Sequence, residues 1–180
     1  MRTKSLFVAL EVPPSCAEVL AGLNPGDAGV QWLPAEQLNL AMSRKWQVDE
    51  EEEERLCEAL AQVKIHPFFL PLHGVAAYGK PPAIAVSVGI GKGHPNFFAL
   101  HRHIQDAALH ARLQPDLRPY HPHVTIARAE ETPKAKFQRF LRENADEEFC
   151  MWKVPGFALF QVEETFEGNF YSVERRFTEG

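Results

Sequence analysis

The chain of 180 residues is poor in cysteine, has no long apolar segment and carries no excess of positive charge. Cys16, Cys57 and Cys150 are scattered and include no Cys-x-x-Cys pair, which fits a reducing cytoplasm and predicts no thiolate metal site. No stretch approaches the roughly 20 apolar residues of a membrane span, so no membrane association is expected. The formal net charge of −5 argues against a protein that coats nucleic acid through bulk electrostatics. It does not exclude a small basic pocket that reads one phosphate.

What is present is the composition of a folded domain. Hydrophobic residues make up 45% of the chain and aromatic residues 11%, which is enough to bury a core, and the length predicts a single domain over residues 1–180. The first residues are basic, but their apolar run stops at Glu11, so they predict a strand and not a signal peptide. We therefore expect a soluble, cytoplasmic protein. Because no heptad and no large apolar surface helix is evident, we expect a monomer.

Hydrophobic periodicity predicts an alternation of strands and helices along the chain. Strands are predicted at 5–12, 38–42, 68–79, 83–90, around 120–127, about 152–165 and 169–177, and helices at 13–24, 49–64, 96–113 and 133–145. Ser15 and Glu18 have the spacing of a capping box. The acidic turn after Asp49 suits the positive end of a helix dipole. Pro71 indicates that its strand is an edge strand or is locally broken.

One predicted strand carries a histidine and a threonine that are two residues apart. In "RPYHPHVTIARAE", His123, Thr125 and Ala127 are predicted on one face, and Val124 and Ile126 on the other. A lone histidine on a strand is usually structural, but a histidine and a threonine two residues apart project into the same space.

The order of elements repeats, which gives this strand a counterpart. The strand "LNLAM", a helix and two strands form one unit, and the strand "HPHVTIA", a helix and two strands form another. We interpret the two series as two lobes that face each other. Asn39 and Ala41 then occupy in the first lobe the places that His123 and Thr125 occupy in the second.

Two His-x-Thr strands that meet across a pseudo-twofold axis would form a phosphoester site without a metal. One imidazole takes a proton from an attacking water, and the other gives a proton to the leaving ribose oxygen on the opposite side of phosphorus. Positioned proton transfer of this kind contributes about 10²–10⁴-fold to the rate. The threonine hydroxyls donate to the non-bridging oxygens, whose charge grows in the transition state.

The sequence resembles the 2H phosphoesterase superfamily, in its branch of RNA 2′,3′-cyclic phosphodiesterases, also called 2′-5′ RNA ligases. The similarity runs along nearly the whole chain, through "LFVALEVP", "VQWLPAEQLNLAM", "HGVAAYGKPPAIAVSVG", "LRPYHPHVTIAR" and "FALFQVEETFEGNFYSVERRF". The resemblance implies an α+β fold of two pseudo-symmetric lobes, with two antiparallel sheets around a central cleft and helices outside.

The resemblance also implies an activity, which is the opening of a 2′,3′-cyclic phosphate on an RNA or nucleotide end to leave a 2′-phosphate. No metal and no cofactor is implied. His123 would activate water, Thr125 would donate to a phosphate oxygen, and Arg128 would contact the phosphate.

The sequence departs from the family pattern in the first motif. Asn39 stands where the first catalytic histidine belongs, and Ala41 where its threonine belongs. The following segment, "SRKWQV", also lacks the usual Phe-Leu-Gly, whose aromatic ring stacks on a base. Arg44 or Trp46 is a candidate to replace that stacking, and Asn39 can still donate a hydrogen bond to the substrate.

Other histidines are possible replacements for the missing imidazole. By sequence the nearest are His73 and His121, and His121 together with the motif histidine also permits an HxH metal site, although no third ligand is evident. His101, His103 and His110 share no i, i+4 ligand pattern and are interpreted as surface residues.

Three functions are therefore compatible with the sequence. The first is an RNA 2′,3′-cyclic phosphodiesterase with weakened or altered activity. The second is a module that binds RNA ends or nucleotides without turnover. The third is a structural protein that reuses the fold.

Overall fold

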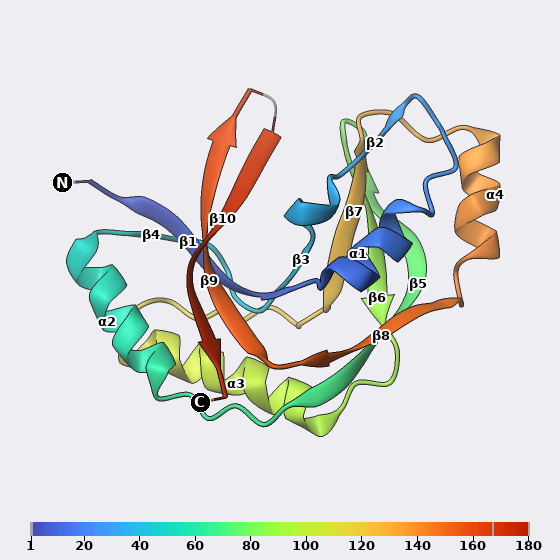
Figure 1. Cartoon of the computed structure of the whole chain (residues 1–180). Helices are drawn as coiled ribbons and strands as arrows, with labels where there is room; N and C mark the ends of the chain where they lie inside the picture. Colours follow the sequence, from blue (N-terminus) through green and yellow to red (C-terminus); the bar gives the residue numbers. More distant parts are fainter. Residues whose placement is uncertain (1, 167, 180) are drawn as a thin grey trace.

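The strands of the chain form one strongly curved antiparallel sheet, which has helices on its outer side (Figure 1). The computed structural model describes residues 2–166 and 168–179. Its strands are β1 (Lys4–Glu11), β2 (Val30–Trp32), β3 (Asn39–Ala41), β4 (Trp46–Val48), β5 (Phe68–Lys80), β6 (Ala83–Ile90), β7 (His123–Ala129), β8 (Glu148–Val154), β9 (Gly156–Thr165) and β10 (Gly168–Thr178). Its helices are α1 (Pro14–Ala21), η1 (Ala35–Gln37, a 3₁₀ turn), α2 (Glu50–Ala61), α3 (Pro95–His110) and α4 (Ala135–Glu143). Within the described ranges, no helix combines the length and the apolar character needed to cross a membrane.

The sheet divides into two halves. Its strand order is β10-β9-β1-β3-β7-β6-β5-β8, with β4 beside β1 and β2 beside β7. The halves meet between β3 and β7, where the described residues contribute one register pair, Leu40 with Val124. The prediction of an α+β fold with two antiparallel lobes is thus confirmed. The two sheets are, however, hydrogen-bonded into one at the centre.

The two halves are not the two repeated units of the sequence. Hairpin β5–β6 follows β3 in the chain but pairs with β7, and hairpin β9–β10 follows β7 but pairs with β1 next to β3. Each half therefore joins the motif strand of one unit to the hairpin of the other. This exchange places β3 and β7 side by side at the centre.

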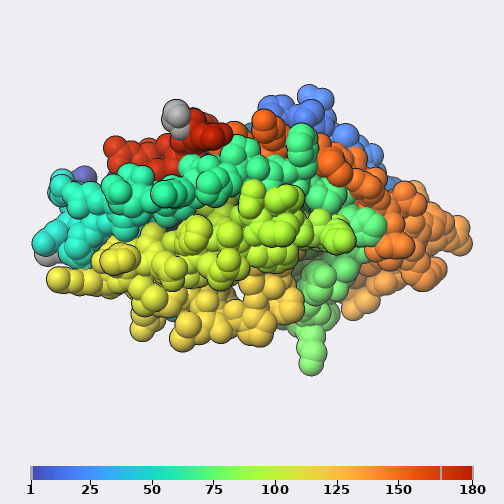
Figure 2. Space-filling view, turned by 90° about the horizontal axis from the view of Figure 1, so that it is seen from below, coloured from blue at the N-terminus to red at the C-terminus, as the bar shows by residue number. Residues whose placement is uncertain are grey.

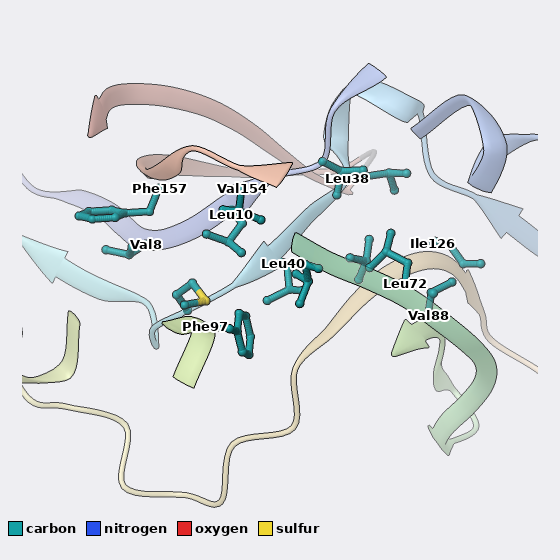
Figure 3. Packing of buried hydrophobic residues seen from close by; sticks show 14 of the residues in the cluster. Val8, Leu10, Leu38, Leu40, Leu72, Val88, Phe97, Ile126, Val154 and Phe157 are labelled. Atoms are coloured by element: carbon teal, nitrogen blue, oxygen red, sulfur yellow. The ribbon is translucent and has the colours of Figure 1, made fainter. Parts of the chain in front are cut away.

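The core lies between the sheet and its helices. Buried side chains from both halves meet there, including Val8, Leu10 and Leu40 from one half and Leu72, Val88 and Ile126 from the other (Figure 3). Helices α2 and α3 pack against each other, and α3 and α4 contact β5. Seen from below, α3 covers a large part of the surface beside α2 (Figure 2). The amphipathic pattern of α3 is confirmed, because Phe97 and Ile104 are fully buried.

Helices α1 and α2 differ in whether a side chain caps their first turn. Helix α2 begins after Asp49, whose carboxylate accepts a hydrogen bond from the backbone N–H of Glu52 at 2.8 Å, while the Glu52 carboxylate accepts from the backbone N–H of Asp49 at 3.1 Å. The capping box predicted from Ser15 and Glu18 is wrong. Helix α1 begins at Pro14 with no side-chain cap, so Ser15 lies inside the first turn.

Two of the three cysteines form a disulfide that their spacing in the sequence does not predict. Cys16 on α1 and Cys150 on β8 are joined by a disulfide, with their Cα atoms 5.8 Å apart, and Cys57 is free. The interpretation of scattered cysteines as typical of a reducing cytoplasm misses this pair, because the two residues are brought together only by the packing of α1 on β8.

Candidate functional site

The structure brings the two motif strands into contact at the centre of the sheet. Leu40 and Val124 are register partners and are both fully buried on the core side. Because side chains alternate along strands, their neighbours project from the opposite face. In an antiparallel pair this register sets Ala41 across from His123, and Asn39 across from Thr125.

A β-bulge in β7 changes which residues share the face of His123. The register with β6 shifts between Val86 and Ser87, which leaves Ile126 as the extra residue in β7. Ala127 is consequently buried and Arg128 exposed. The predicted placement of Ala127 beside Thr125 is therefore wrong. The bulge instead turns Arg128 toward the face of the motif.

The position of its backbone neighbour fixes the tautomer of His123. Its Nδ1 lies 2.6 Å from the carbonyl oxygen of His121. A carbonyl oxygen only accepts, so Nδ1 carries the proton and donates. In the neutral ring Nε2 then holds the lone pair. His123 is exposed, so this lone pair can accept a proton from water.

Thr125 has a hydroxyl partner that sequence reasoning missed. The Oγ atoms of Thr125 and Ser87 lie 3.4 Å apart, and Ser87 on β6 is the register partner of Thr125. Ser87 is only 2% exposed. Its one signal in the sequence is a serine inside an apolar strand, "AIAVSVGI".

The first half of the cleft presents different groups. The side-chain amide of Asn39 donates to the carbonyl of Gln37 at 3.3 Å, and Ala41 presents only a methyl group. Glu11 on β1 is the register partner of Asn39. Its carboxylate accepts from Arg176 Nε and Nη2 at 2.7 and 3.0 Å. Sequence reasoning singled out neither residue of this ion pair as part of the site. The pair lies on the face opposite the core.

A cavity of about 450 Å³ opens beside Ala41 and His123. Its lining residues come from the end of β3 and the residues after it, from α3, and from the segment that leads into β7: Ala41, Met42, Ser43, His101, Asp116, Arg118, Pro119, Tyr120, His121 and His123. The hydroxyl of Tyr120 donates to the backbone oxygen of Ala41 at 2.7 Å. Burial raises the pKa of Tyr120, so this hydroxyl stays protonated and remains a donor. A hydrogen bond from Arg118 lowers the pKa of Asp116 to about 2.

The interpretation of His101 as a surface residue is wrong. Its ring stacks on Tyr120 with the centroids 3.7 Å apart, and burial lowers the pKa of His101. The Gln105 side-chain amide lies 2.8 Å from the Met42 carbonyl and 3.3 Å from His101 Nε2. Since that amide nitrogen donates to both, His101 carries its proton on Nδ1. His103 on the same helix is exposed, as predicted.

The remaining sequence candidates lie at different distances from this centre. Trp46 is buried and its indole N–H donates to the carbonyl of Gln114 at 2.7 Å, so it is a core residue and cannot stack on a base. Arg44 is exposed and donates to the Gln114 side chain at 3.2 Å. It lines a neighbouring groove that it shares with Ser43, Asp116 and Arg118.

His73 and His121 also lie at different distances from the cavity. His121 lines the central cavity, whereas His73 lies on β5, one strand beyond β6, with Nε2 2.7 Å from Asp146. Among the described residues, no group of three or more His, Cys, Asp or Glu side chains is placed to hold a metal ion. The HxH pair therefore gains no third ligand from that part of the chain.

Two central strands meet at one register pair, and one of them carries a histidine and a threonine whose hydroxyl lies beside that of a buried serine. This is the arrangement of strands that the resemblance to a two-motif phosphoesterase fold implies. The sequence profile of the 2′-5′ RNA ligase superfamily matches residues 38–165. The chain belongs to this superfamily, as the resemblance predicted.

Individual relatives are distant. The chain is 26% identical over 169 residues to the RNA 2′,3′-cyclic phosphodiesterase of Geobacillus stearothermophilus, a match that covers 90% of this chain and 53% of that protein. The chain thus spans about half the length of this relative.

Solved structures establish the likeness of fold. The complex of E. coli LigT with 3′-AMP is similar with a TM-score of 0.75 at 18% identity, over 98% of both chains. The protein TT0787 of Thermus thermophilus gives 0.75 at 22% identity, over 97% of both chains. The PDE domain of MHV ns2 gives 0.55 at 13% identity, over 88% of this chain and 99% of that domain.

Proposed function

We propose that the chain binds RNA or nucleotide ends carrying a 2′,3′-cyclic phosphate and opens the ring slowly, leaving a 2′-phosphate. The observation that carries this proposal is the state of His123. Its Nδ1 donates to the His121 carbonyl, and Nε2 of this exposed residue keeps a free lone pair. Membership of the superfamily supports the substrate class. The name of the Geobacillus relative supports it as well.

His123 acts as the general base. Its Nε2 takes a proton from water as the water oxygen attacks phosphorus, and the bond from phosphorus to the ribose 3′ oxygen breaks. Thr125 donates a hydrogen bond to a non-bridging oxygen, with Ser87 at 3.4 Å beside it. Arg128, turned to this face by the bulge, supplies a positive charge for the phosphate. Arg44, in the adjoining groove, contacts the nucleotide farther from phosphorus.

Protonation of the leaving 3′ oxygen is the step that this site catalyses poorly. The Asn39 amide can donate a hydrogen bond but cannot transfer a proton at neutral pH, so the leaving 3′ oxygen takes its proton from solvent water. Loss of one positioned acid costs about 10²–10⁴ in rate, and loss of one oxyanion donor costs roughly 10²–10³. The two losses do not simply multiply, since both groups serve one transition state.

The direct test compares three proteins on a dinucleotide with a 2′,3′-cyclic phosphate. The unmodified chain should open the ring slowly, and His123→Ala should abolish this activity. Asn39→His combined with Ala41→Thr should raise the rate by about 10² or more. His103→Ala removes an exposed histidine elsewhere and should change nothing. Turnover that is unaffected by His123→Ala would contradict the proposed mechanism.

A second candidate is a binding module without turnover, which the substitutions at Asn39 and Ala41 favour. It predicts that adenosine 2′-monophosphate binds in calorimetry while the cyclic dinucleotide stays intact. Absence of heat at millimolar nucleotide would count against both candidates. We further propose that the protein works in the cytoplasm as a single-domain monomer, without a metal or cofactor.

A further inference from the structure

Arg176 on β10 lies across the sheet to reach Glu11 on β1. The two residues form a bidentate ion pair of 2.7 and 3.0 Å, although β9 separates their strands. Ala158 is the register partner of Arg176, and Ala9 is the partner of Ala158. Both alanines are fully buried. Their small side chains leave space above the sheet for the arginine side chain to extend toward Glu11.

This ion pair is one strand away from the altered motif. Glu11 is the register partner of Asn39, and Ala9 is the partner of Ala41. Facing side chains in such pairs have their Cβ atoms about 5 Å apart. The guanidinium is fixed by Glu11 on the same face, so it lies beside the strand that lacks an imidazole and a hydroxyl.

The guanidinium keeps donors for a ligand. Bidentate pairing uses two of its five N–H groups, so three remain, and two of these form a second fork of the kind that fits a phosphate. The side chains of Arg176 and Glu11 are 62% and 40% exposed. The second fork is therefore open to a ligand and not enclosed by the fold.

The two halves of the cleft differ in this row of the sheet. In the second half, Thr125 faces Ser87, which carries a second hydroxyl group, and the next residue in the row is Ala76 on β5. In the first half, Ala41 faces Ala9 and the row continues to Arg176. The first half thus has methyl groups where the second half has two hydroxyl groups, and its nearest polar group in this row is the guanidinium of Arg176.

We propose that Arg176, oriented by Glu11, is a phosphate-binding residue that replaces the lost hydrogen-bond donor of the first motif. This inference rests on the proposed function. Its ligand is the terminal phosphoester of a nucleotide, whose non-bridging oxygens accept two hydrogen bonds from the free fork. The guanidinium remains protonated at neutral pH, so it stabilises phosphate charge and transfers no proton. The half of the reaction that needs an acid stays slow.

The test is the binding of adenosine 2′-monophosphate, measured by calorimetry, in parallel with ring opening of the cyclic dinucleotide. Arg176→Gln should weaken binding by about 10- to 100-fold, since a charged hydrogen bond is worth roughly 1.5–3 kcal/mol. Arg176→Lys should keep the charge but recover only part of the affinity, because an ammonium cannot form the fork. Arg175→Gln is the matched control. Its residue lies next in the chain but lines a separate cavity with Lys4 and Cys57, so it should change binding less than twofold.

A double-mutant cycle gives the sharpest outcome. If Arg176 replaces the lost donor, Arg176→Gln should cost several-fold less in the Asn39→His, Ala41→Thr background than in the unmodified chain. Equal binding by Arg176→Gln and the unmodified chain would overturn this inference, and it would leave the proposed function standing if His123→Ala is inactive. Absence of both binding and turnover in the unmodified chain would instead overturn the proposed function.

Discussion

His101 and His123 line the same cavity and carry the proton on the same ring nitrogen, Nδ1, but different nitrogens of the two rings are engaged in hydrogen bonds. His123 donates from Nδ1 to a backbone carbonyl, which leaves Nε2 free to act as a base. His101 accepts at Nε2 from Gln105, which leaves an Nδ1 proton as a donor. The two rings that line the cavity therefore differ in the group left free, which is a lone pair on Nε2 in His123 and an N–H on Nδ1 in His101.

Stability should depend on pH through His101. Burial lowers its pKa below the ordinary value near 6.5, against a smaller opposing effect of Asp116 and a smaller supporting effect of Arg102. Because the folded state binds the proton less tightly, this contribution to stability is present above about pH 6.5 and is lost as the pH falls through the lowered pKa. Ring NMR titration should give His101 a midpoint below 6.5.

The matching variant is His101→Phe, which keeps a ring on Tyr120 but cannot titrate. Urea unfolding at pH 5 and pH 7.5 should show a smaller loss of stability at the lower pH for this variant than for the unmodified chain. A His101 midpoint at or above 6.5, or identical pH dependence in both proteins, would contradict the assignment.

Single elements differ in how their ends are stabilised, and the cap of α2 should be measurable. Asp49→Ala removes the acceptor for the Glu52 backbone N–H and should lower the free energy of unfolding by about 1 kcal/mol. Ser15→Ala removes a residue that has the capping spacing but makes no cap bond in α1, so it should change stability by less than about 0.5 kcal/mol. Urea denaturation measures both, and equal effects would contradict the difference between the helix starts.

Regular elements could be predicted because their periodicity is local. The buried Leu38, Leu40 and Met42 of the β3 region and the buried face of α3 follow directly from residue spacing. The bulge at Ile126 could not be predicted, because it arises from the register between β7 and β6 and has no signal in the sequence of β7 alone. The sequence prediction also merges β8 and β9. Pro155 separates them in an apolar run that has the pattern of one strand.

At the scale of the whole molecule, the repeat in the sequence predicted two halves but not their composition. The same series of strands and helices would arise whether each hairpin paired with its own motif strand or with the other one. Exchange of the hairpins sets β3 and β7 together. It also places β10 in the half that carries Asn39, which is why Arg176, near the C-terminal end of the chain, reaches Glu11 beside β3.

The same long-range packing produces the disulfide between Cys16 and Cys150, which are 134 residues apart. A cross-link that closes so long a loop restricts the unfolded chain, which the chain-entropy estimate values at about 5 kcal/mol, although measured effects are typically about 2–4 kcal/mol. Cys150→Ser should therefore lower the midpoint of thermal unfolding by several degrees and make it insensitive to dithiothreitol. The unmodified chain and the control Cys57→Ser should both lose stability on reduction. Three free thiols in the unfolded, unreduced protein, or equal midpoints with and without reductant, would show that α1 is held on β8 by packing alone.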